Sequence, residues 1–228
     1  MKTILALIAL IAQTLAGNAH AALIFNKVEQ PTEVSQTGLL DYFDSQGGTR
    51  ILDSVRLILS GSMTSYITLA NYTSVPQTLY ADGGVLLDFS TTPSGILGAL
   101  GVAPAISLTV ATGDQTVDAV GVMALGTYTS PALTDTDTWD SLVRTDASVL
   151  SAFTGSGTFK LTCTSKTSLA SNTAAIPNTL ATQDAYAACG AQVIYTYGPT
   201  TQLPEPATLM LSALGLLGLA ISRGRGAL

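Results

Sequence analysis

Apolar and polar side chains alternate along much of this chain with a period of two residues, which is typical of half-buried β-strands. The alternation is clear over 49–60, 65–70, 159–164 and 191–197, and Gly61 is expected to end the first of these strands. In that strand, one parity is predicted to face the core and is made up of Ile51, Asp53, Val55, Leu57 and Leu59. The pattern predicts a protein built mainly from β-strands.

Turn signals rich in Gly, Pro, Asp and Ser separate these runs. They lie at 82–84, 92–95, 113–114, 130–131 and 155–157. Short helical turns are expected over 96–102 and 146–153. The stretch 165–188 is rich in Ser, Thr and Ala with weak periodicity, which predicts either a loop or a loop with a short helix near 183–188. Short strands with regular turns predict an all-β fold, an antiparallel, jelly-roll-like β-sandwich.

The N-terminal segment departs from this pattern with a continuous apolar run. Lys2 precedes the run at 4–16, and Ala19-His20-Ala21 follows as an A-x-A cleavage site. This order predicts a signal peptide over 1–21 and a mature chain that starts at Ala22. An uncleaved N-terminal anchor is the alternative, but the short apolar run followed by a good cleavage site favours cleavage.

A second continuous apolar run lies at 207–222 and is followed by Arg223 and Arg225. At about 1.5 Å per residue this run forms a helix of about 24 Å, close to the thickness of a bilayer core. Arginines after the helix and none just before it place its C-terminal side in the cytoplasm. A buried core helix is the alternative, but the run has no polar face. We therefore expect a transmembrane helix at 207–222 with a basic stop.

A short polar motif, Pro204-Glu205-Pro206, stands directly before this apolar run. Together with the Gly- and Leu-rich run and the terminal arginines, it resembles the bacterial PEP-CTERM sorting signal. The resemblance implies recognition by exosortase, a membrane-embedded enzyme that removes the tail near the Pro-Glu-Pro motif. It also implies a precursor held in the cytoplasmic membrane of a Gram-negative bacterium that makes extracellular polysaccharide. The expected organisation is a signal peptide (1–21), an exported domain (22–197), a linker (198–203) and a sorting signal (204–228).

The exported region carries a second resemblance. Its motifs are Leu52-x-Ser54-Val55-x-Leu57-x-Leu59-x-Gly61, Ile67-x-Leu69-x-Asn71, Pro76-Gln77-Thr78 and Leu150-x-x-Phe153-x-Gly155-x-Gly157. Over about residues 23–197 these are similar to the choice-of-anchor E family, bacterial exported β domains carried on different C-terminal anchors. The resemblance implies a β fold and export, and it brings no catalytic residue with it.

The charge of the exported region limits its partners. Residues 22–203 hold six basic side chains against fourteen carboxylates, a net charge of −8. Without a basic patch to neutralise phosphates, nucleic acid is not expected as a partner. The region is long enough for one domain with a core of its own.

Histidine is confined to His20, inside the expected signal peptide. A mature chain without histidine has no Ser-His-Asp or Cys-His nucleophile and no His-containing metal site. Carboxylate pairs, Lys, Tyr and oxygen-ligated metals are the chemistry that remains. We therefore expect no enzymatic activity and no cofactor.

Two cysteines, Cys163 and Cys189, occur in the exported region. An even count in an oxidising compartment predicts one disulfide, and two free buried thiols are the alternative. Both residues have the parity expected to face the core. A disulfide here is expected to stabilise the fold by about 3–4 kcal/mol in the chain-entropy description.

Two further segments suggest ligands. Asp135, Asp137 and Asp140 would present oxygen ligands to Ca²⁺ if their segment curls into a loop, although it lacks the glycine and distal glutamate of an EF-hand. Aromatic side chains would form a sugar-stacking platform, which makes extracellular polysaccharide a candidate partner. The aromatic candidates are Tyr66, Tyr72, Tyr80, Trp139, Tyr195 and Tyr197.

Together these features predict an exported surface or extracellular-matrix protein that acts by structure and association. A carbohydrate-binding module retained in extracellular polysaccharide is the alternative. The precursor is expected in the cytoplasmic membrane and the processed protein in the cell envelope or the matrix.

Overall fold

The computed structural model describes residues 19–33, 35–101, 104–120 and 126–199. Its elements are almost all β-strands, paired antiparallel, as the sequence predicts. They are β1 (Ala19–Asn26), β2 (Gln30–Pro31), β3 (Ser35–Asp41), β4 (Arg50–Asn71), β5 (Gln77–Leu79), β6 (Ala81–Thr92), α2 (Gly95–Ala99), β7 (Ala105–Ala111), β8 (Gln115–Val117), β9 (Gly126–Thr129), β10 (Leu133–Asp140), α3 (Ala147–Phe153), β11 (Thr158–Ser171), η1 (Asn172–Ala175) and β12 (Thr179–Pro199).

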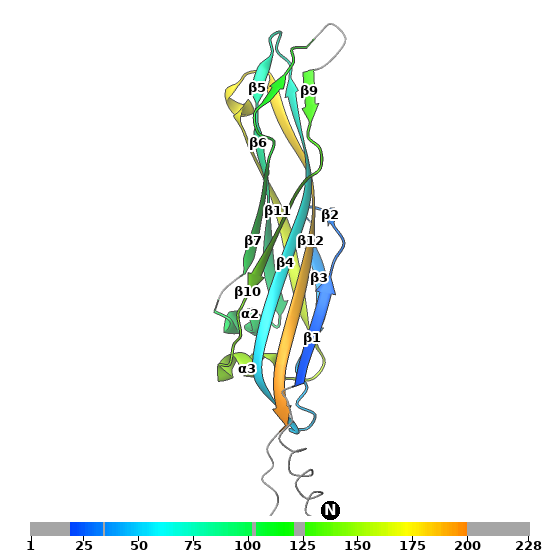
Figure 1. Cartoon of the computed structure of the whole chain (residues 1–228), viewed down its shortest axis with the longest axis vertical. Helices are drawn as coiled ribbons and strands as arrows, with labels where there is room; N and C mark the ends of the chain where they lie inside the picture. The colour runs from blue at the N-terminus through cyan, green and yellow to red at the C-terminus, as the bar shows by residue number, and fades with distance from the viewer. Residues whose placement is uncertain (1–18, 34, 102–103, 121–125, 200–228) are drawn as a thin grey trace, which may run out of the picture.

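Two main sheets run along an elongated body (Figure 1). One sheet has the order β1-β12-β4-β10, with β2 paired to β12 and β9 paired to β4. The other has the order β3-β11-β6-β7, and β5 and β8 pair separately. In Figure 1, α2 and α3 lie at the lower end, where β1 begins and β12 ends, and β5 and β9 lie at the upper end.

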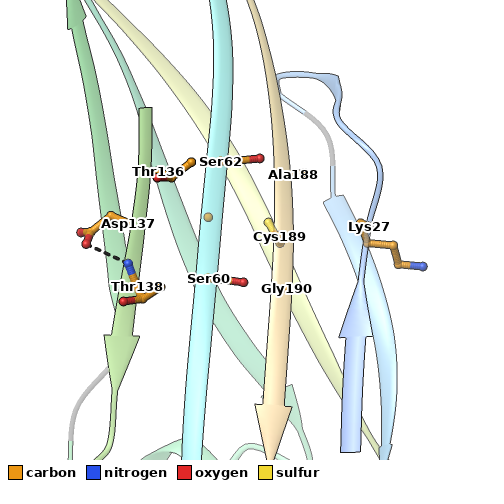
Figure 2. Close-up of a pocket in the computed structure, with 10 residues that line it drawn as sticks. Lys27, Ser60, Ser62, Thr136, Asp137, Thr138, Ala188, Cys189 and Gly190 are labelled. Carbon is orange, nitrogen blue, oxygen red and sulfur yellow. Dashed lines mark hydrogen bonds between the residues drawn. The ribbon is translucent and has the colours of Figure 1, made fainter. Parts of the chain in front are cut away.

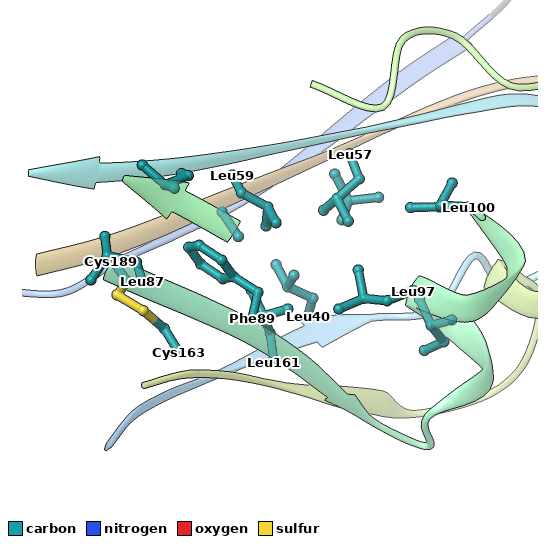
Figure 3. Close-up of a cluster of buried hydrophobic side chains, with 14 of the residues drawn as sticks. Leu40, Leu57, Leu59, Leu87, Phe89, Leu97, Leu100, Leu161, Cys163 and Cys189 are labelled. Atoms are coloured by element: carbon teal, nitrogen blue, oxygen red, sulfur yellow. A yellow bond between two sulfur atoms is a disulfide. The ribbon is translucent and has the colours of Figure 1, made fainter. Parts of the chain in front are cut away.

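Side chains from both main sheets form one large core in the lower half of the body. Leu57 and Leu59 of β4, Leu87 of β6 and Leu161 of β11 are all fully buried there (Figure 3). A smaller core in the upper half contains Ile67, Leu69, Leu79, Ala81 and Val117. The expected helical turns are present as α2 and α3, next to the larger core.

The prediction that Gly61 ends a strand is wrong, because β4 continues through it to Asn71. A Cβ at Gly61 would collide with Leu87 Cδ1 and would lie 3.3 Å from Ile106 Cγ2, both in the opposite sheet. Glycine therefore allows the two sheets to approach closely at this point. The turn predicted at 82–84 is also wrong, because these glycines too lie within a strand on which other strands pack closely. Gly83 and Gly84 lie within β6, where a Cβ on Gly83 would come 2.7 Å from Gln183 Nε2.

The parity predicted for the start of β4 is also wrong. Ile51 is 53% exposed and Asp53 is exposed, whereas Leu52 is buried. The pairing of β4 with β12 explains this, because Tyr197 lies opposite Leu52 while Thr196 lies opposite Ser54. The extra residue, Asp53, forms a β-bulge that reverses the parity below it.

The loop or short helix predicted over 165–188 is largely strand instead. β11 extends to Ser171 and pairs with β6, and β12 begins at Thr179 and pairs with β4. Only η1 and a short turn separate the two strands. The polar Ser/Thr composition hides these strands, because in the upper half fewer of their side chains are buried and the alternation is lost.

Candidate functional site

The predicted sorting residues Pro204, Glu205, Pro206, Arg223 and Arg225 and the predicted helix at 207–222 lie outside the described residues. Among the residues that the structure describes, no helix is both long and apolar enough to cross a bilayer. The described chain ends at Pro199 in β12, so Gly198 and Pro199, predicted as linker, are part of this strand. β12 ends at the lower end of the body (Figure 1).

The predicted signal-cleavage residues lie in β1, paired with β12. Ala19 lies opposite Tyr197, Ala21 opposite Tyr195 and Ala22 opposite Ile194. Cleavage before Ala22 would leave the remaining five residues of β1 in the sheet. The chain thus enters and leaves the domain side by side, and the cleavage site itself stays a prediction.

Cys163 of β11 and Cys189 of β12 form the disulfide, with their Cα atoms 6.5 Å apart. Both are buried in the large core, and the bond joins the two main sheets (Figure 3). Gln36 of β3, which the sequence analysis missed, supports this junction. Its Nε2 donates to Ala187 O at 2.8 Å, and its Oε1 accepts from Cys189 N at 3.3 Å. No local sequence signal distinguishes this glutamine from an exposed one.

The three aspartates considered as Ca²⁺ ligands lie on the extended strand β10, so the loop on which that site depends is not formed. Asp135 Oδ2 accepts from Thr109 N at 2.7 Å, Asp137 Oδ1 from Thr138 N at 2.7 Å, and Asp140 is paired with Arg56. In the described part of the chain, no three His, Cys, Asp or Glu side chains are grouped closely enough to hold a metal ion.

The six aromatic candidates do not form one platform. Tyr195 is buried in the core, where its hydroxyl donates to Asp41 O at 2.9 Å. Tyr197 packs against Phe43 with the rings tilted and lies under Arg50. Trp139 packs against the core. The remaining three are exposed. They are Tyr66 on β4 and Tyr72 and Tyr80 near the upper end.

Shifts in pKa accompany structural contacts. The guanidinium of Arg56 donates to Asp140 Oδ1 at 3.0 Å, which lowers the pKa of that carboxyl. An ion pair with Asp88 at 2.9 Å raises the pKa of Lys166. Burial raises the pKa of Tyr195. The shifts of Asp140 and Lys166 arise because an opposite charge stabilises the ionised side chain, and the shift of Tyr195 arises from burial. None of these three shifts activates a nucleophile.

A groove of about 570 Å³ lies on the solvent face of the sheet that contains β10, β4 and β12. Its floor is formed by small residues, with Ser60 and Ser62 on β4 and Ala188 and Gly190 on β12. Thr136 and Thr138 of β10 border one side, and Lys27 lies beyond β12 on the other (Figure 2). Because Gly61 faces the core, its neighbours Ser60 and Ser62 face solvent. The groove offers hydroxyl groups, which both donate and accept hydrogen bonds.

Comparison with solved structures gives weak likenesses to virus structures. A Desmodium yellow mottle tymovirus structure is 10% identical over 81% of this chain and 90% of its own, with a TM-score of 0.20. An infectious bursal disease virus Gx strain structure is 13% identical over 92% of this chain and 50% of its own, with a TM-score of 0.18. Likenesses this weak carry no conclusion. No curated protein matches the chain.

One comparison is specific. Residues 202–225 match the PEP-CTERM protein-sorting motif, which confirms the resemblance of the tail. The motif implies an exported protein that is sorted by exosortase and held in the membrane before processing. The most specific functional feature of this chain is therefore a sorting motif that follows a region built mainly from β-strands.

Proposed function

We propose that this chain is the precursor of a non-catalytic protein of the bacterial surface or extracellular matrix, which acts by structure and association. The single observation that carries the proposal is the sorting motif at 202–225. Exosortase would process the tail near Pro204-Glu205-Pro206 and release the domain from the cytoplasmic membrane. The signal peptide over 1–21 and the membrane helix at 207–222 belong to the same proposal.

The exported part is proposed to be a jelly-roll-like β-sandwich of the choice-of-anchor E type. Two antiparallel sheets that share one core, with a disulfide between them, support this description. A cross-linked, mostly β body suits a protein that persists outside the cell, where disulfides are stable.

The proposal that the protein is not an enzyme rests on its chemistry. Its one histidine, His20, would be removed with the proposed signal peptide. The ionic contacts with shifted pKa values, such as Arg56 with Asp140 and Lys166 with Asp88, bring opposite charges together instead of pairing an acid with a base. Such pairs stabilise charge, and general acid–base catalysis needs groups whose pKa lies near the working pH.

A carbohydrate-binding module is the second candidate, and one observation favours it. Tyr66 and Tyr186 are exposed on the same face of the sheet as the hydroxyl-lined groove. Aromatic faces and hydroxyl groups are the two chemical features that a sugar surface complements.

The proposed function is tested by fractionating the native host into inner membrane, outer envelope, matrix and medium. The full chain is compared with a variant in which Pro204, Glu205 and Pro206 are all alanine. The native chain is expected in the envelope or matrix and the variant in the inner membrane. An identical distribution of the two proteins would contradict the proposal.

A further inference from the structure

The outer face of the β4 and β12 pair forms a continuous polar track above the groove. Going up β4, the outward side chains are Ser60, Ser62, Thr64, Tyr66 and Thr68, since their neighbours Gly61, Met63, Ser65, Ile67 and Leu69 are buried. At about 3.4 Å per residue, this row spans about 27 Å. The track is therefore long and narrow, which suits a linear chain better than a small molecule.

Hydroxyl groups flank this row on the side of β10 and β9. Thr136 of β10 lies opposite Ser62, and Thr134 lies opposite Thr64. Higher up, Thr129 of β9 lies opposite Thr68, and their hydroxyl oxygens are 3.2 Å apart. These hydroxyls come from three strands of one sheet, so their spacing is fixed by the register of the sheet.

Two tyrosines interrupt the hydroxyl rows at one place. Tyr66 lies opposite Asp184, and Tyr186 lies opposite Thr64, so the tyrosines are diagonal neighbours on adjacent strands. Diagonal side chains on one face of a sheet lie within reach of each other when they are aromatic. Tyr66 is 41% exposed and Tyr186 is 39% exposed, although a tyrosine gains free energy when its ring is covered. Pro31 of β2 is exposed and lies opposite Tyr186, which extends the apolar spot.

The charged side chains along the track affect whether neutral or acidic polymers bind. Glu29 reaches the face, where its Oε1 accepts from Ser62 Oγ at 3.2 Å, and Asp184 lies beside Tyr66. Lys27 borders the groove. Asp137 also borders it but lies opposite Gly61, with the parity of the inner face. Two carboxylates on the outer face against one ammonium disfavour a polymer that carries uronates or sulfates.

We propose that this face, from the groove at Ser60 and Ser62 to Tyr66 and Tyr186, binds a neutral polysaccharide chain. The tyrosines cover apolar sugar faces, and the Ser and Thr hydroxyls exchange hydrogen bonds with sugar hydroxyls. An extended peptide suits the lower part of this face less well, because β4 is paired there with β12 on one side and with β10 on the other, which leaves it no free edge for backbone hydrogen bonds. The inference rests on the proposed export and adds a ligand and its site.

The test is affinity electrophoresis of the processed protein, purified from its host, through gels that contain hydroxyethylcellulose, dextran or the neutral fraction of the host's extracellular polysaccharide. Alginate serves as the acidic comparison. At least one neutral polymer is expected to retard the protein more than alginate does. Retardation by alginate alone, or by none of the polymers, would overturn the proposal.

Two variants locate the site. Tyr66→Ala/Tyr186→Ala is expected to weaken the retardation about tenfold or more, because both stacking surfaces are lost. Ser60→Gln is expected to weaken it by filling the groove. The matched control is Tyr72→Ala/Tyr80→Ala, which removes two equally exposed tyrosines near the upper end of the domain. Circular dichroism and melting curves establish that all variants are folded.

Equal retardation of the native protein and Tyr66→Ala/Tyr186→Ala would overturn the site, as would an equal loss in the control. These outcomes are distinct from failure of the proposed function. If the protein reaches the matrix in the fractionation experiment but no neutral polymer retards it, the proposed sorting stands and the proposed binding site is wrong.

Discussion

The two halves of the elongated domain bury their side chains in different ways. The lower half contains a large core to which both sheets, α2 and α3 contribute, and the disulfide crosses it. The upper half has a small core of five fully buried residues, centred on Ile67, Leu69 and Leu79. Four long strands, β4, β6, β11 and β12, pass through both halves.

The upper half keeps its form through strand pairing and close packing of small residues. A Cβ on Gly84 would lie 2.6 Å from Ser168 Oγ, so a side chain fits there only if Ser168 moves. Asn71 is buried and donates through Nδ2 to Val75 O, Val117 O and Asp118 O. The comparison indicates that burial of hydrophobic side chains stabilises the lower half, whereas pairing between the long strands holds the upper half together.

The largest expected effect comes from removing a core leucine. Leu57→Ala is expected to lower the free energy of unfolding by about 3–5 kcal/mol, because the large lower core cannot collapse around the cavity. Leu79→Ala, in the small upper core, is expected to cost about 2–3 kcal/mol, because fewer packed neighbours surround it. Urea unfolding followed by the fluorescence of Trp139 measures both. An upper-half loss as large as the lower-half loss would contradict the comparison.

A smaller effect is expected from adding a methyl group where the sheets approach each other. Gly61→Ala is expected to destabilise the protein by about 1–3 kcal/mol, because the new Cβ meets Leu87 and Ile106 inside the packed core. Gly84→Ala is expected to cost less, since Ser168 can rotate away. Gly95→Ala is the control, with no atom within 4 Å of the new Cβ. Thermal melting ranks the three, and a higher cost for Gly84→Ala than for Gly61→Ala would contradict this view of the core.

The smallest effect concerns the ion pair of Arg56 and Asp140 on the surface of the lower half. Because folding lowers the pKa of Asp140, the pair stabilises the protein above the unfolded-state pKa of that carboxyl. This stability is lost as the pH falls through the lower, folded-state pKa. Asp140→Asn is therefore expected to melt below the native protein at neutral pH and to approach it at strongly acidic pH. Asp53→Asn is the control, and a difference that persists unchanged in acid would refute this linkage.

The sequence predicted the elements whose pattern is local. The alternation correctly predicted which side chains are buried in β4 from Val55 to Leu59 and in β11 from Phe159 to Cys163. Turn residues located the breaks at 113–114 and 130–131, and the shared core parity of the cysteines agreed with their disulfide.

The remaining features depend on partners far away in the chain. The bulge at Asp53 is set by its register with β12, and the glycines of β6 are explained only by the strands packed on them. Tyr66 and Tyr186, 120 positions apart in the sequence, become diagonal neighbours through strand pairing, and Tyr186 was absent from the predicted aromatic platform. The upper part of β11 and β12 was missed because few of its side chains are buried, so hydrophobic periodicity could not mark it.

The central claim, sorting by exosortase, is tested most directly by the intact mass of the protein from its native host. The mass is measured separately for the inner membrane, envelope and medium fractions. We predict material in the envelope or medium that starts at Ala22 and has lost the residues beyond the Pro204-Glu205-Pro206 region. A chain that still ends at Leu228 and remains in the inner membrane would contradict sorting and show a simple membrane-anchored protein.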